Sequence, residues 1–117
     1  EYLSDLWQRC GYDLTSLTAK DIAQAAEAGN ATAREILDHA TEALGWAIAQ
    51  VITITAADVV VIGGGVAQLG EPMFFAPLRK QVARYGFAPL QGHYRIAPAA
   101  LEELVVVHGA LAIAVEA

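Results

Sequence analysis

The sequence predicts a helix-rich α/β fold in which a short parallel sheet ends in a glycine-rich turn. Four consecutive β-branched residues, Val59 to Ile62, form a wholly apolar run, which is typical of a parallel strand buried on both faces. Three glycines, Gly63 to Gly65, follow this run directly. Long segments on either side carry apolar residues at the three- and four-residue steps of amphipathic helices.

The first thirty residues predict two short helices. The first covers residues 1–10 and the second covers residues 19–28. Thr18 is a suitable N-cap for the second helix, and Asn30 is a suitable N-cap for the helix that follows it. Gly29 is placed to end the second helix. The side chains expected to point inward are Leu3, Leu6, Trp7, Ile22, Ala25 and Ala26.

Residues 31–54 predict the longest helix of the chain. Its first half carries charged residues on its outer side, whereas its second half is apolar nearly all round. Gly45 lies within it, and a helical glycine costs about 1 kcal/mol relative to alanine. Such a glycine indicates a close contact with another helix or with a ligand. The apolar positions at helical steps are Ala33, Ile36, Leu37, Ala40, Leu44, Ala47, Ile48, Val51 and Ile52.

The second half of the chain predicts a helix, a short strand and a terminal helix. Pro72 suits the first position of a helix over residues 72–85, with Phe75, Leu78 and Val82 pointing inward. The alternation of residues 93–97 predicts a strand. Residues 100–115 predict a helix that is apolar on most sides, and we expect other segments to cover it on several faces. His108 within it is expected to be a satisfied core histidine.

Composition and charge exclude several classes of protein. The net charge of −6 and the pI near 4.8 argue against nucleic-acid binding. The single Cys10 excludes an internal disulfide framework and fits a cytoplasmic protein. Polar residues interrupt residues 43–62, so we expect a buried helix and strand there rather than a membrane span.

The chain is unusually apolar for its length, with 56% hydrophobic and 17% charged residues among 117. A domain of this size has too large a surface relative to its volume to bury that much apolar area. We therefore expect part of the surface to meet a missing segment of a longer protein or a second subunit, as in a homo-oligomer such as a dimer.

The glycine turn at Gly63 to Gly65 is the candidate binding site. Ligands of open α/β sheets bind outside the carboxyl ends of the strands, and glycines let a flat ligand approach the backbone closely. The turn lacks the Lys-Ser/Thr pair of a phosphate loop and the spacing of a dinucleotide fingerprint. Residue chemistry alone leaves two alternatives open, which are contact with a nucleotide and close packing of a tight turn. We identify no constellation of catalytic side chains. We also identify no metal site, because no two histidines have the spacing of metal ligands.

The order of several segments resembles the C-terminal half of the ROK family of repressors and sugar kinases. These segments are Leu17 to Asn30, Ala43 to Ala49, Val59 to Ala67 and Val107 to Ala114. The resemblance implies a partial ribonuclease H-like domain of the actin-like ATPase type, with only a remnant of the parallel sheet. It also implies that residues 1–117 are a fragment of the C-terminal domain, with the N-terminal domain and the zinc motif outside it.

The resemblance assigns site residues as well. Gly63, Gly64 and Gly65 would form the turn that binds the adenosine of ATP or ADP, with Mg²⁺ in the full-length protein, and Val66 would lie near the adenine or ribose. The carboxylate of Glu1 would accept hydrogen bonds from sugar hydroxyls, a role that suits a carboxylate. As an alternative, Glu1 is only an N-terminal charge favoured by the helix dipole. The family's zinc site would lie outside this chain.

The resemblance implies an ATP-dependent hexose kinase. The alternatives are the sugar-sensing domain of a ROK transcriptional repressor and a non-catalytic α/β interaction domain. The fragment alone is not expected to catalyse phosphoryl transfer, because the phosphate-binding loop and catalytic aspartate of such kinases lie upstream. The chain departs from the family pattern at Ser4-Asp5, where Ser-Gly is common, and at Ala57-Asp58, where Asn-Pro is common.

Overall fold

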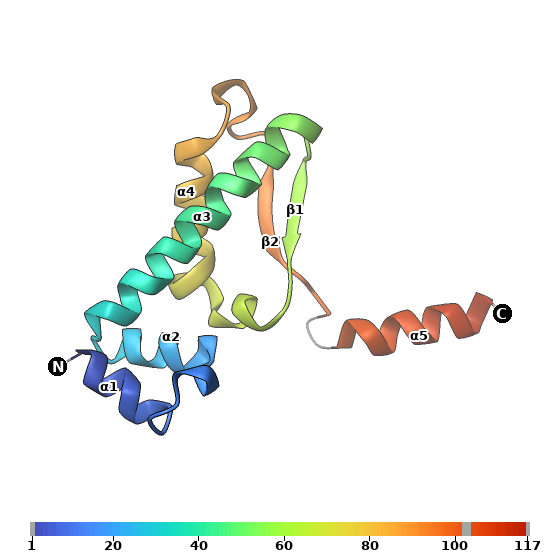
Figure 1. The fold of residues 1–117 in the computed structure, drawn as a ribbon. Coiled ribbons are helices and arrows are strands. Elements are labelled where there is room, and N and C mark those ends of the chain that lie inside the picture. Colours follow the sequence, from blue (N-terminus) through green and yellow to red (C-terminus); the bar gives the residue numbers. More distant parts are fainter. Residues whose placement is uncertain (1, 102–103, 117) are drawn as a thin grey trace.

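The computed structural model describes residues 2–101 and 104–116 as helices around a two-stranded parallel sheet (Figure 1). The α/β class and the short parallel sheet predicted from the sequence are confirmed. In chain order the elements are α1 (Tyr2–Arg9), η1 (Leu14–Ser16), α2 (Ala19–Glu27), α3 (Ala31–Thr55), β1 (Val59–Ile62), η2 (Gly65–Leu69), η3 (Glu71–Phe75), α4 (Ala76–Tyr85), η4 (Ala88–Leu90), β2 (Arg95–Pro98) and α5 (Val105–Glu116).

The predicted helix starts are confirmed by their capping geometry. The Thr18 hydroxyl accepts a hydrogen bond from the backbone N–H of Asp21, and the Asp21 carboxylate accepts one from the backbone N–H of Thr18. This reciprocal pair is a capping box, which satisfies two backbone donors at once. At the start of α3, the Asn30 side-chain oxygen accepts from the N–H of Ala33 at 3.0 Å.

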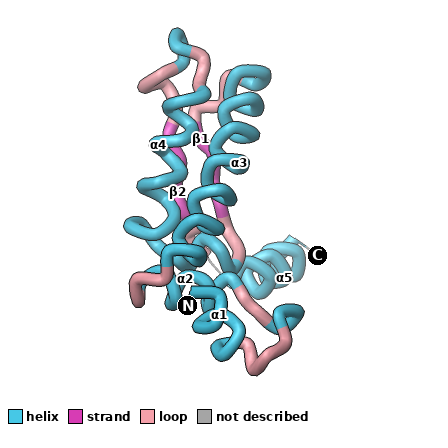
Figure 2. Tube along the Cα trace, turned by 60° about the vertical axis from the view of Figure 1, so that its left-hand side comes forward, coloured by secondary structure: helices cyan, strands magenta, loops and turns pink. Residues whose placement is uncertain are grey.

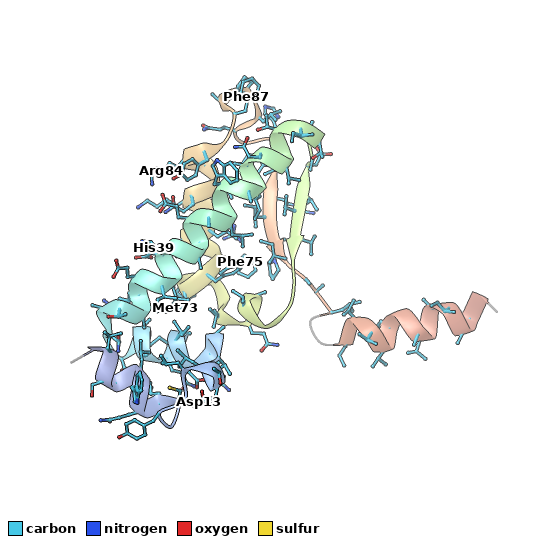
Figure 3. The ribbon with its side chains drawn as sticks, viewed as in Figure 1. Asp13, His39, Met73, Phe75, Arg84 and Phe87 are labelled. Carbon is cyan, nitrogen blue, oxygen red and sulfur yellow. The ribbon has the colours of Figure 1, made fainter. Side chains whose placement is uncertain are left out.

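Helices α3 and α4 lie side by side and cover one face of the sheet (Figure 2). Gly45 marks their crossing, because a Cβ atom at this position would lie 2.5 Å from the Cβ of Gln81 on α4. Gly45 therefore makes the helix contact that its sequence position predicted. Phe75 lies at the centre of the molecule and is 2% exposed, whereas Arg84 and Phe87 lie at its outer edge (Figure 3). The buried core under these helices consists of Ile48, Ala49, Ile52, Phe74, Phe75, Leu78, Val82 and Ile96.

Strand β1 pairs in parallel with β2, with Val59 opposite Arg95 and Ile62 opposite Pro98. The expectation that β1 is buried on both faces was wrong. Val60 and Ile62 pack against the core, but Val59 and Val61 are 38% and 58% exposed. The reason is that helices cover only one face of the sheet within the described residues.

The terminal helix also differs from expectation. It begins at Val105 rather than near residue 100, and it extends away from the rest of the molecule (Figure 1). Its side chains, His108 included, are exposed from Val105 to Val115, so the expected cover and the expected core histidine are wrong for this chain. Near the N-terminus, Leu6 is buried, but Leu3 and Trp7 are exposed. None of the described helices is long and apolar enough to cross a membrane.

Candidate functional site

The glycine turn follows directly from the carboxyl end of β1. Gly64 has φ 86° and ψ 179°, a combination that is essentially restricted to glycine. The carbonyl of Gly64 then accepts a hydrogen bond from the N–H of Ala67 at 3.1 Å, which starts the tight helix η2. The turn therefore needs a glycine at position 64 for a reason of backbone conformation alone.

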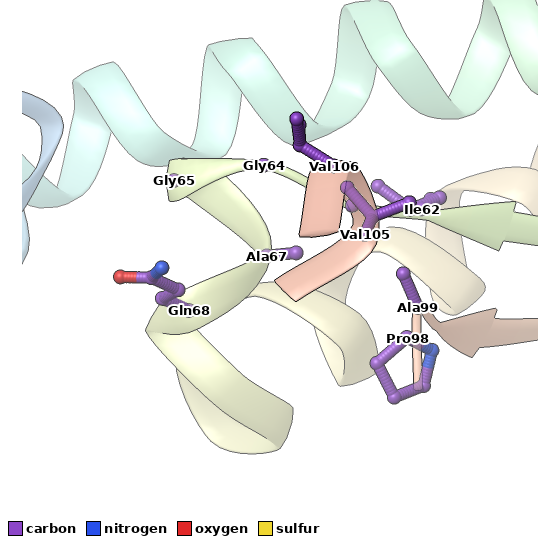
Figure 4. Close-up of a pocket in the computed structure, with 10 residues that line it drawn as sticks. Ile62, Gly64, Gly65, Ala67, Gln68, Pro98, Ala99, Val105 and Val106 are labelled. Atoms are coloured by element: carbon purple, nitrogen blue, oxygen red, sulfur yellow. The ribbon is translucent and has the colours of Figure 1, made fainter. Parts of the chain in front are cut away.

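A pocket of about 350 Å³ lies at this turn (Figure 4). The glycines form one side of it, and the end of β2 together with the first turn of α5 forms the other. The described residues that line it are Ile62, Gly63, Gly64, Gly65, Ala67, Gln68, Pro98, Ala99, Val105 and Val106. The turn is thus open to a cleft and is not sealed beneath packed side chains.

The three glycines differ in their surroundings. A Cβ atom on Gly63 would lie 3.2 Å from the Cβ of Ala99, so this glycine permits close packing of two chain segments. Cβ atoms on Gly64 and Gly65 would meet no atom of the described chain within 4 Å. The packing alternative therefore accounts for Gly63, whereas the bare backbone at Gly64 and Gly65 faces open space.

The chemistry of the pocket suits binding rather than acid–base catalysis. Gln68 is the polar residue of its described lining, which otherwise combines backbone peptide groups with the aliphatic side chains of Ile62, Ala67, Pro98, Ala99, Val105 and Val106. Exposed N–H and C=O groups can hydrogen-bond the polar edge of a ligand, and the aliphatic side chains can cover its apolar face. The site can therefore hold a flat ligand with polar edges.

The other predicted site residues have different positions. Val66 is 44% exposed on η2, between two residues that line the pocket. Glu1 lies outside the described residues. The sequence did not identify Pro98, Ala99, Val105 or Val106 as parts of the site. The parallel pairing of β2 with β1 was the available signal for the first two, because it places both carboxyl ends at one edge of the sheet.

The titratable groups with shifted pKa values have structural roles. Hydrogen bonds from Thr18 lower the pKa of Asp21, and a hydrogen bond from Asn30 is the main cause that lowers the pKa of Asp5. The hydrogen bond that Tyr85 donates to Glu42 raises the pKa of that phenol. Each of these groups stabilises a cap or a helix contact. Within residues 2–101 and 104–116, no three His, Cys, Asp or Glu residues gather to hold a metal ion.

Comparison with known proteins gives one family. The sequence profile of the ROK family matches residues 3–117. A glucokinase from Thermotoga maritima is 33% identical over 113 residues, which make up 97% of this chain and 35% of that protein. A glucokinase from Halalkalibacterium halodurans is 38% identical over 69 residues, which make up 59% of this chain and 21% of that protein.

Solved structures agree on the fold. A ROK family glucokinase from Streptomyces griseus, crystallised with glucose and AMPPNP, superposes with a TM-score of 0.81 at 22% identity. A Cytophaga hutchinsonii protein assigned as a sugar kinase superposes with a TM-score of 0.72 at 18% identity. The matched regions cover 99% and 97% of this chain but only 37% and 40% of those proteins. The present chain therefore has part of the fold of these sugar kinases and spans about a third of the length of its relatives.

Proposed function

This chain belongs to the ROK family, and from that premise we propose that residues 1–117 are part of the C-terminal domain of an ATP-dependent hexose kinase. Two curated relatives that bear the name glucokinase support a sugar as the substrate class. The glycine turn supplies the binding surface for the adenosine of ATP or ADP. The sugar, the phosphate groups and Mg²⁺ are held mainly by parts of the protein outside these residues, as is the family's zinc site.

One observation carries this proposal. The backbone at Gly64 and Gly65 faces open space in a pocket at the carboxyl end of a parallel strand, which is where α/β sheets bind ligands. A nucleoside fits such a surface, because its ring can lie against bare peptide where a Cβ atom would hold it away.

The role of this segment in the reaction is positioning. Phosphoryl transfer depends mostly on aligning the nucleotide with the acceptor hydroxyl and on stabilising charge on the transferred group. By holding the adenosine, the turn at Gly63 to Gly65 fixes one end of the nucleotide, so that its phosphates reach the sugar. The titratable groups with shifted pKa values on this segment serve its caps and helix contacts.

Gly65→Ala in the full-length protein tests the glycine turn. The new methyl group would enter open space without backbone strain, because Gly65 has no positive φ and no neighbour within 4 Å of its Cβ position. We expect ADP to bind about tenfold more weakly in titration calorimetry, because an added methyl in a fitted contact costs on the order of 1–2 kcal/mol. Unchanged ADP affinity would mean that the nucleotide does not lie against the backbone at Gly65.

Gly109→Ala is the matched control. Like Gly65, Gly109 has no positive φ and no neighbour within 4 Å of its Cβ position, but it does not line the pocket. It should leave ADP affinity unchanged.

Glucose phosphorylation by the unaltered full-length protein tests the activity itself. Glucose binding without phosphorylation would instead favour a ROK repressor, and the absence of both sugar and nucleotide binding would favour an interaction domain.

A further inference from the structure

We propose that the first turn of α5 forms the apolar wall of the nucleotide pocket, and that Val105 and Val106 contact the base. This inference rests on the proposed nucleotide site at Gly63 to Gly65. It adds residues from a separate helix, about forty positions further along the chain, to a site that the glycine turn alone had indicated.

The end of β2 brings this helix to the pocket. The N–H of Ala99 donates a hydrogen bond to the carbonyl of Ile62 at 2.9 Å, and the Cβ of Ala99 approaches Gly63 closely. The chain after β2 is therefore attached to the start of the glycine turn. Val105 and Val106 lie across the pocket from this turn (Figure 4).

The two sides of the pocket have complementary chemistry. The glycine side offers peptide N–H and C=O groups, and the opposite side offers the aliphatic surfaces of Pro98, Val105 and Val106. Val105 and Val106 are 55% and 76% exposed, so a ligand could remove considerable apolar surface from water here. A nucleobase has two flat apolar faces and polar edges, whereas a phosphate is charged on all sides and a sugar ring has only a small apolar face surrounded by hydroxyl groups. The wall therefore suits the base.

The remaining apolar residues of α5 provide an internal comparison. Ile113 and Val115 are 72% and 87% exposed, yet neither lines the pocket. Exposure alone therefore does not distinguish Val105 and Val106. Their position beside the glycine turn does.

The double variant Val105→Ala/Val106→Ala in the full-length protein tests the wall. Alanine is a better helix former than valine, so the substitutions remove side-chain contacts while favouring the helix. We expect titration calorimetry to show about tenfold weaker binding of both ADP and adenosine, given about a factor of four per buried methyl group and only partial contact. Glucose affinity and inhibition by tripolyphosphate should stay unchanged, because neither ligand carries a base.

Val115→Ala is the matched control on the same helix and should bind ADP like the unaltered protein. Val106→Thr preserves side-chain shape and repeats the test should the double variant fold poorly; we expect about threefold weaker ADP binding from the polar hydroxyl at an apolar contact. ADP and adenosine affinities within twofold of the unaltered protein in the valine variants would overturn the inference, as would equal weakening by Val115→Ala. An unaltered protein that binds neither ADP nor adenosine would instead overturn the proposed function.

Discussion

Gly45 shows at the level of one residue how a missing methyl group sets the distance between two helices. A Cβ atom there would lie 2.5 Å from the Cβ of Gln81 and 3.2 Å from its backbone carbonyl carbon. These atoms belong to the rigid part of α4, so a side chain at position 45 would force the helices apart. The glycine weakens the local helix by about 1 kcal/mol and in return allows the α3–α4 contact on which the core depends.

Gly45→Ala should therefore destabilise the protein, although alanine is the better helix former. We expect a loss of about 1–3 kcal/mol in the free energy of unfolding, the usual cost of overpacking a core, measured by urea denaturation. The exchange Gly45→Ala/Gln81→Gly should recover part of that loss, because it removes the facing Cβ atom. Additive effects of the two substitutions would contradict direct contact between them.

At the level of elements, the side-chain amide of Asn30 links α1 to α3, because its oxygen bonds to one helix and its nitrogen to the other. Its oxygen caps α3, and its side-chain nitrogen donates to the Asp5 carboxylate on α1 at 2.8 Å. Asn30 is 3% exposed, so the cap is buried between α1, α2 and α3. A small apolar cluster joins these helices and consists of Leu6, Ala25, Ala26 and Ala33. This bond is the main reason that the pKa of Asp5 lies below its ordinary value of 3.8.

Asn30→Ala should cost about 1–2 kcal/mol of stability through the lost cap and raise the pKa of Asp5 toward 3.8, as measured by NMR titration of the carboxyl carbon. Because folding lowers this pKa, the contribution of Asp5 is present above about pH 3.8 and is lost as the pH falls through the folded value. Asn30→Ser retains a capping oxygen but no amide donor. It should keep most of the stability and still raise the pKa of Asp5. If the pKa of Asp5 in both variants equals its value in the unaltered protein, the result would contradict the hydrogen bond between Asn30 and Asp5.

Local signals predicted the elements well, because their causes lie within a few residues. The caps at Thr18 and Asn30 and the buried positions Leu78 and Val82 follow from short-range spacing, and all were confirmed. The environment of each element was predicted less well. Val61 and the terminal helix have the apolar composition of buried segments. Their burial depends on packing against residues that are distant in the sequence.

The same division applies to the candidate site. The sequence identified Gly63 to Gly65 because the strand and its turn are continuous. It did not identify Val105 and Val106, which reach the pocket only because β2 pairs with β1 and helix α5 follows β2. No local pattern distinguishes these two valines from Val107 or Val115, and only the tertiary arrangement does.

At the level of the whole molecule, the chain is more extended than an independent domain. Its radius of gyration is 17.2 Å, whereas a compact domain of this length has about 13 Å. Its accessible surface is 7884 Å², whereas a folded monomer of 12.4 kDa exposes about 6100 Å². The excess includes large apolar side chains on α5, on the outer side of α3 and on β1. These surfaces are those that a longer protein or a second subunit would cover.

The 117-residue chain on its own should therefore self-associate. Exposed apolar area of this extent favours association, and β1 adds an uncharged edge strand, which is a template for pairing between chains. We expect light scattering coupled to size exclusion to give masses above 12.4 kDa that rise with concentration. Ile113→Glu/Val115→Glu should reduce the effect by placing charge on the exposed C-terminal end of α5. A constant monomer mass at all concentrations would mean that the helix folds back onto β1 or α3 and covers these surfaces within one chain.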